Sequence, residues 1–245
     1  MHAAEHLEHI KADGPALAAA ARQRPDAPVP SCPGWDVTAL VAHTGRVHRW
    51  AGDLVATRSS GPMRRQTPPE AGGDAEIVVT WYEEGLRRLV DELSRIDPDE
   101  PVWNWLADGP GPARFWHRRM AQETAIHRWD AEAAVGAAAP IDRLLAVDGI
   151  DEYLGMLPAR LERNPVPGLA GSLHLHATDG EGEWWLGLAP DHIEQRREHA
   201  KADAALQGPA SALFLWLVNR RPADGPELRA FGDGAILEAW QSVTF

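Results

Sequence analysis

The chain contains few of the features that mark secreted, membrane-spanning or nucleic-acid-binding proteins. Among its 245 residues there is a single cysteine, Cys32, which excludes an internal disulfide. No apolar run in the sequence approaches the roughly 20 residues that a membrane-spanning helix needs. The N-terminus also lacks the basic and apolar regions of a secretory signal. We therefore expect a cytoplasmic protein that does not associate with a membrane.

Positive charge is also scarce. The sequence has 24 Lys and Arg residues against 36 Asp and Glu, a formal net charge of −12. Because affinity for nucleic acid depends on basic side chains that neutralise phosphates, we expect no nucleic-acid partner. Internal repeats, a Gly-x-Ser-x-Gly nucleophile elbow and a lysine-containing phosphate loop are absent from the sequence. With 44% hydrophobic residues, the chain is typical of a globular protein of one large or two ordinary domains.

Helical periodicity dominates the first half of the chain. Helices are expected over residues 5–23, 37–56, 74–96 and 112–135. Gly14-Pro15 should kink or split the first of them, and Asp36 should be the N-cap of the second. Four helices of this length joined by loops predict a four-helix bundle.

The second half has a mixed pattern. Residues 172–178 alternate apolar and polar side chains, and a Gly-containing turn joins them to 183–188, which predicts a β-hairpin. Further helices are expected over 141–163, 209–219 and 234–242, and further strands over 202–207 and 227–231. The predicted fold class is therefore two-domain α+β, with a helical bundle over 1–138 and a smaller α+β domain over 139–245.

A carboxylate and an imidazole, those of Glu123 and His127, lie four residues apart in the fourth predicted helix. This spacing places them side by side on one face, which they share with apolar residues such as Trp116 and Met120. A carboxylate facing the core needs a partner. A metal ion is one possibility, since Glu and His are both zinc ligands. A hydrogen-bonded couple, or pairing with a nearby arginine (Arg118, Arg119 or Arg128), explains the spacing equally well.

A third ligand for such a metal can come from His43. It lies on an apolar stripe of the second predicted helix and would meet Glu123 and His127 if the two helices are neighbours. Three protein ligands with an open position are typical of catalytic zinc, although a lone His on an apolar stripe is more often a core residue. We expect His48, five residues further on, to lie at or near the surface.

Two other candidates have simpler explanations. His174 and His176 share one face of a predicted strand and could chelate a metal, but alternating positions of this kind favour a solvated face. Cys32, just before a predicted helix, could gain thiolate character from the helix N-terminus. We interpret it as a structural or incidental thiol.

Several segments together resemble the mycothiol-dependent maleylpyruvate isomerase family. They are residues 29–36 (VPSCPGWD), 40–43 (LVAH), 123–132 (ETAIHRWDAE), 148–152 (DGIDE), 208–211 (GPAS) and 232–233 (GD). The resemblance extends over nearly the whole chain. It implies an N-terminal bundle like that of the DinB superfamily and a smaller α+β C-terminal domain.

The resemblance also implies a site and a chemistry. Its zinc ligands correspond to His43, Glu123 and His127, and its cosubstrate is mycothiol, a small thiol of actinobacteria. An active-site arginine of the C-terminal domain corresponds to Arg220 or Arg221, which are adjacent here. Zinc would lower the pKa of the thiol and make it nucleophilic.

Two functions follow from this resemblance. The enzyme would either isomerise a maleylpyruvate-like substrate or transfer the thiol to an electrophile, acting as a monomer on small molecules. The alternative is a non-catalytic protein that binds a small ligand or a partner and contains a structural metal.

Overall fold

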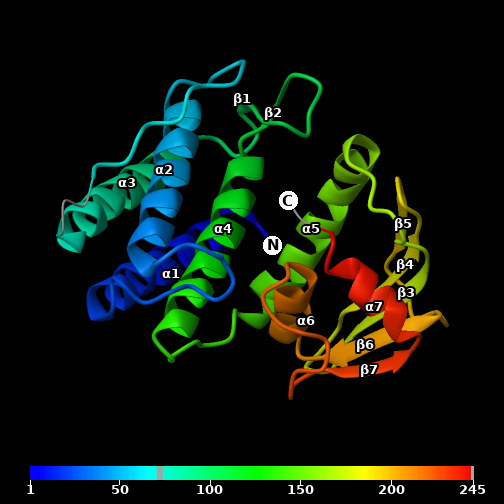
Figure 1. The fold of residues 1–245 in the computed structure, drawn as a ribbon. Helices are drawn as coiled ribbons and strands as arrows, with labels where there is room; N and C mark the ends of the chain where they lie inside the picture. The colour runs from blue at the N-terminus through cyan, green and yellow to red at the C-terminus, as the bar shows by residue number, and fades with distance from the viewer. Residues whose placement is uncertain (71–73, 244–245) are drawn as a thin grey trace. The chain divides into compact units, whose positions relative to one another are not determined.

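A computed structural model describes residues 1–70 and 74–243 (Figure 1). The chain divides into two compact units, Met1–Ala139 and Pro140–Phe245, which we call the helical unit and the α+β unit. Within the described residues, no helix is long and apolar enough to span a bilayer.

The helical unit is built from four long helices. They are α1 (Ala3–Gln23), α2 (Val37–Ala56), α3 (Ala75–Arg95) and α4 (Arg114–Ala134). Helix α2 packs against both α3 and α4, and α1 also packs against these two helices. The apolar stripes meet in a core whose fully buried members include Leu17, Leu40, Leu89 and Trp116. Asp36 is the N-cap of α2 as predicted, because its Oδ1 accepts a hydrogen bond of 2.7 Å from the backbone N–H of Ala39.

The split that was predicted as one possibility at Gly14-Pro15 does not occur, because helix α1 continues through this pair. Gly14 is instead a point of close helix packing. A Cβ atom there would lie 2.4 Å from Cδ2 of Leu86 on α3. The hydroxyl of Tyr82, also on α3, donates a 3.1 Å hydrogen bond to the Gly14 carbonyl. Tertiary packing therefore stabilises the segment in which local propensity is weakest.

The α+β unit contains a five-stranded sheet and three helices. Its strands are β3 (Gly171–Ala177), β4 (Glu183–Leu188), β5 (Ile193–Arg196), β6 (Ala204–Gly208) and β7 (Arg229–Gly232). Their order is β5-β4-β3-β6-β7, with β3 and β6 parallel and the other neighbours antiparallel. Its helices are α5 (Arg143–Arg163), α6 (Ala210–Leu217) and α7 (Gly234–Trp240).

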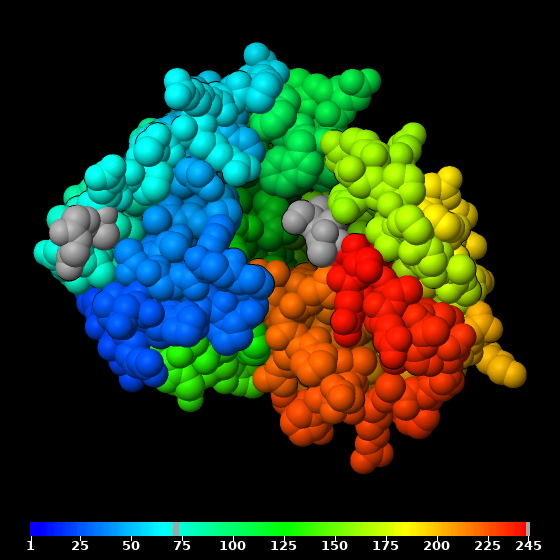
Figure 2. Space-filling model, in the orientation of Figure 1, coloured from blue at the N-terminus to red at the C-terminus, as the bar shows by residue number. Residues whose placement is uncertain are grey.

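The three helices lie on one face of this sheet (Figure 1), the face to which β3 contributes the buried Leu173 and Leu175. The α6 and α7 regions, orange and red in Figure 2, adjoin at the surface. Beneath them the rings of Trp216 and Trp240 stack with centroids 5.6 Å apart. Alternate residues of β3 face away from the helices.

Three short strands were not predicted. They are β1 (Pro101–Trp103) and β2 (Pro110–Pro112), which pair in the helical unit, and β5. The first two are three residues long and begin with proline, and β5 is a polar edge strand with one buried residue. Neither the two short strands nor the edge strand shows the alternation of apolar and polar residues on which strand prediction depends.

Candidate metal centre

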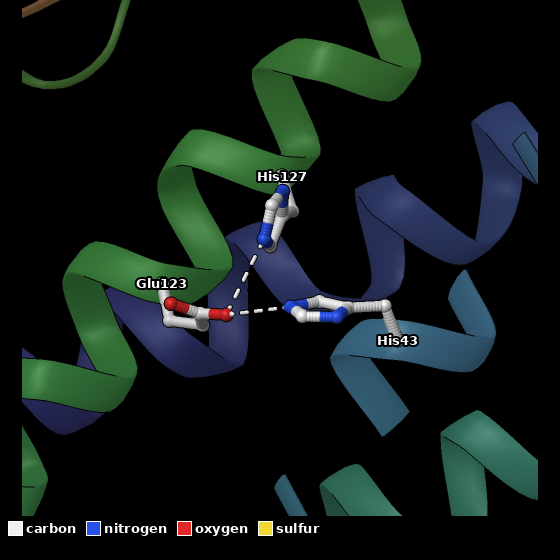
Figure 3. Close-up of side chains that lie close together, drawn as sticks. All are labelled: His43, Glu123 and His127. Atoms are coloured by element: carbon white, nitrogen blue, oxygen red, sulfur yellow. Dashed lines mark ion pairs between the residues drawn. The ribbon is translucent and has the colours of Figure 1, made fainter. Parts of the chain in front are cut away.

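Helices α2 and α4 bring together the three side chains that were predicted as metal ligands. His43 extends from α2, and Glu123 and His127 extend from adjacent turns of α4 (Figure 3). One ligand atom from each residue lies within 4.8 Å of those of the other two. The four-residue spacing on α4 and the contact between the helices therefore place two imidazoles and a carboxylate at one point.

The two distances from the Glu123 carboxylate to the imidazoles fit a tetrahedral zinc ion. Oε1 of Glu123 lies between the two rings, 3.4 Å from His43 Nε2 and 3.3 Å from His127 Nε2. Ligands bound to zinc at about 2.0–2.1 Å in tetrahedral geometry are about 3.3 Å apart. The donor types also suit zinc, and three protein ligands leave a fourth position for a substrate atom.

A buried carboxylate fixes the orientation of His127. Asp130, which is fully buried, has Oδ2 2.9 Å from His127 Nδ1, and its Oδ1 accepts a 2.6 Å hydrogen bond from the Ser31 hydroxyl. A carboxylate on one ring nitrogen of a metal ligand orients the other toward the metal and makes it more basic. Asp130 was not predicted from the sequence, although its three-residue spacing from His127 was a usable signal.

The same contacts determine how the cluster is protonated without a metal. Burial lowers the pKa of His127, but hydrogen bonds and charge from Asp130 and Glu123 outweigh it and raise this pKa to about 9. Burial raises the pKa of Glu123, whereas hydrogen bonds from His127 and His43 hold it well below its usual range. The cluster is thus an imidazolium–carboxylate group in which a cation can replace a proton.

Two arginines border the cluster. Nη2 of Arg119 lies 3.4 Å from Glu123 Oε2, and Nη2 of Arg46 lies 3.4 Å from His43 Nδ1. Glu123 therefore has both an arginine partner and histidine partners, on different oxygens. Arg128, another predicted partner, pairs instead with Asp13 and Glu132. The guanidinium groups of Arg46 and Arg119 add positive charge beside the cluster.

His48 is fully buried, so its predicted place at the surface is wrong. Helix α2 is covered by α3 on one side and α4 on another, so a position well away from the His43 stripe is still enclosed. Its Nε2 lies 2.9 Å from Thr124 Oγ1, and burial lowers its pKa to about 4. His48 is therefore a neutral core residue.

The remaining candidates occupy different environments. Cys32 is partly buried, with its Sγ 3.9 Å from Asp130 Oδ2. Arg220 and Arg221 follow α6 in the α+β unit. Nη1 of Arg220 donates a 3.0 Å hydrogen bond to the Val218 carbonyl, and Arg221 forms an ion pair with Glu227.

Comparison with known families identifies both units. The model of the mycothiol maleylpyruvate isomerase N-terminal domain matches residues 7–132, and that of the MDMPI C-terminal domain matches 145–239. The chain belongs to the mycothiol maleylpyruvate isomerase family. This family is one of enzymes, and the resemblance drawn from the sequence is confirmed.

A solved structure of the isomerase family has a similar fold. The crystal structure of the mycothiol-dependent maleylpyruvate isomerase gives a TM-score of 0.64 at 13% identity, covering 94% of this chain and 93% of that chain. A mutant of that isomerase gives 0.63 at 12% identity, over the same shares of both chains. No curated protein matches the sequence significantly. The likeness supports the predicted two-domain α+β class.

Proposed function

We propose that this protein is a zinc-dependent enzyme that uses mycothiol, acting in the cytoplasm as a monomer. Its reaction is either cis–trans isomerisation of a maleylpyruvate-like diacid or transfer of the thiol to an electrophile. The observation that carries the proposal is the triangle of His43, Glu123 and His127, whose 3.3 and 3.4 Å separations fit tetrahedral zinc. Membership of the family supports the thiol cosubstrate.

The residues of the helical unit would each have a defined task. His43, Glu123 and His127 hold the ion, and Asp130 keeps Nε2 of His127 directed at it. A zinc ion held by these ligands would lower the pKa of a thiol, so that the thiolate would exist near neutral pH. Arg46 and Arg119 contribute positive charge that attracts an anionic substrate to the cluster.

The isomerisation itself requires no net change of atoms. The thiolate adds to the carbon–carbon double bond of a cis-enone diacid, and the electron pair of that bond moves toward the carbonyl oxygen. The former double bond is then single, so rotation about it is fast. Return of the electron pair expels the thiolate and gives the trans isomer. A guanidinium close to the carbonyl oxygen would stabilise the charge that develops there.

Arg220 and Arg221 are the proposed source of that guanidinium in the α+β unit. Substituting each by Gln separately distinguishes them. Replacing the arginine that acts on the substrate should lower kcat, whereas replacing its neighbour should leave kcat unchanged. Equal activity of both variants and the wild type would remove these residues from the mechanism.

The main experiment measures metal and thiol dependence together. The purified full chain is analysed for bound metal and then assayed with maleylpyruvate and with 1-chloro-2,4-dinitrobenzene, each with and without mycothiol. We expect thiol-dependent turnover of at least one of them. Trans product indicates isomerisation, and a thioether indicates S-transfer. Absence of thiol dependence with both would favour a non-catalytic protein with a structural metal.

A His43→Ala variant tests the ligand assignment. Its zinc content should fall by one ion per chain and its thiol-dependent activity should disappear, while its circular dichroism remains that of the wild type. A His9→Ala variant, on α1 of the same unit, serves as the matched control. A folded His43→Ala protein with undiminished zinc would contradict the proposed site.

A further inference from the structure

The α+β unit contains a second histidine–glutamate cluster that the proposed function does not use. His174 and His176 extend from β3, Glu183 is the first residue of β4, and His199 follows β5. Glu183 is the direct partner of His176 in the antiparallel ladder, and His174 is its diagonal neighbour on the same face. Strand register therefore brings two imidazoles to one carboxylate, and the segment after β5 adds a third.

The contacts in this cluster are short and converge on Glu183. Oε2 lies 2.5 Å from His174 Nε2, while Oε1 lies 2.5 Å from His176 Nδ1 and 3.2 Å from His199 Nδ1. One ligand atom each from His174, Glu183 and His199 falls within 4.8 Å of the other two. The rings of His174 and His199 meet edge to face with centroids 4.9 Å apart.

His174 is more buried than the sequence predicted, because His174 and His176 were expected to lie on a solvent-exposed face of their strand. The side chain of His174 is 6% exposed, that of Glu183 27%, and that of His199 73%. His174 is on the face away from α5–α7, but the side chains of His199 and Glu183 contact it there. The cluster is thus anchored in the sheet at one end and open to solvent at the other, as a site loaded from solution must be.

We propose that His174, Glu183 and His199 bind a divalent transition-metal ion such as zinc, which would replace the 2.5 Å contact between His174 Nε2 and Glu183 Oε2, and that His176 orients the Glu183 carboxylate for it. Two imidazole nitrogens and a carboxylate oxygen are ordinary zinc ligands, and imidazole also suits copper and nickel. The sheet fixes two of the ligands and the segment after β5 supplies the third, so a bound ion would link that segment to the sheet. The ion would therefore stabilise the α+β unit.

The test is metal binding by the metal-free full chain, with the helical cluster removed by His43→Ala. Equilibrium dialysis against Zn²⁺ and the visible spectrum with Co²⁺ should both report one ion per chain in this background. Adding His199→Ala should abolish that binding, and Glu183→Gln should do the same. His192→Ala, an exposed histidine just before β5, is the matched control and should retain the ion.

His176→Ala tests the orienting role separately. It should keep the stoichiometry of one ion but weaken binding about 10- to 100-fold, the range seen when an outer partner of a ligand is removed. A near-normal affinity would instead exclude that role.

Failure of this proposal and failure of the proposed function give different results. If the His43→Ala protein binds no zinc or cobalt, or if His199→Ala and Glu183→Gln leave binding unchanged, the second site is wrong. Neither outcome affects the zinc or the thiol-dependent activity of the helical cluster. Because His199 is largely exposed, loss of the fold is not expected in its variant, and circular dichroism checks this.

Discussion

The two histidine–glutamate clusters are assembled by different kinds of secondary structure. In the helical unit, Glu123 and His127 are one helical turn apart, and packing of α2 on α4 adds His43. In the α+β unit, strand register pairs Glu183 with the histidines of β3, and an irregular segment adds His199. Helical spacing can therefore be recognised in the sequence, whereas cross-strand pairing depends on a register that the sequence does not display.

The clusters also differ in what holds their ligands. His127 is 9% exposed and hydrogen-bonded to a fully buried Asp130, which fixes the orientation of its ring. His199 is 73% exposed and lies on no helix or strand. A preorganised cluster suits chemistry at an open coordination position, and a cluster with one exposed ligand suits stabilisation of a surface segment.

Exchanging the two carboxylates for amides should give the largest contrast. Glu123→Gln removes a proposed ligand of the helical cluster and should lower the thiol-dependent rate on the order of 1000-fold, because metal catalysis contributes several kcal/mol. Glu183→Gln should leave this rate unchanged. Steady-state kinetics with mycothiol, together with metal analysis, measures both. Equal losses in the two variants would refute the division of roles.

Acid should weaken the helical unit through His48. Its folded pKa of about 4 lies below the unfolded value of 6.5, so the unfolded chain binds the proton more readily. Stability is therefore lost as the pH falls from 6.5 to 4, by about 3 kcal/mol in total.

Urea unfolding of the metal-free chain between pH 7 and pH 4 measures this effect. His48→Gln keeps a donor for Thr124 but does not titrate, so its stability should depend less on pH than that of the wild type. His192→Gln, with an exposed histidine of the α+β unit, is the control and should behave as the wild type. If the free energy of unfolding of His48→Gln depended on pH as strongly as that of the wild type, the pH dependence could not be assigned to His48.

Removing the outer carboxylate should have a smaller effect on the helical cluster. Asp130→Asn removes the carboxylate at Nδ1 of His127 and should weaken zinc binding there about 10- to 100-fold, while the second cluster is unaffected. Competition with a chromophoric chelator measures the affinity. Ser31→Ala removes only a hydrogen bond to Asp130 and should give a smaller loss. A larger loss of zinc affinity in Ser31→Ala than in Asp130→Asn would show that Asp130 does not orient His127.

The smallest predicted effect concerns the ends of helices. Asp36→Ala removes the N-cap of α2, the helix that carries His43, and should cost about 1 kcal/mol. Asp142→Ala does the same to α5 of the other unit, where Asp142 accepts hydrogen bonds from Leu144 and Leu145. Hydrogen exchange should show each loss confined to the unit that contains the substitution, since the units are compact separately.

Much of this organisation could be predicted from the sequence. The bounds of α2 are those expected, because its apolar period is regular and Asp36 precedes it as a cap. The group of His43, Glu123 and His127 could also be predicted from the sequence, since two of its members lie on one face of one helix. The continuity of α1 through Gly14-Pro15 could not be predicted in this way, because close packing on α3 overrides the local effect of the pair.

Local periodicity thus determined which residues form helices and which faces of those helices are apolar, because spacing along a helix is fixed by its geometry. Only the tertiary structure decided the environment of each histidine. His48 is enclosed because α2 has neighbours on two sides, and His174 is covered because Glu183 and His199 reach it from other strands and segments. These contacts join residues that are far apart or out of phase in the chain, so no local pattern contains them.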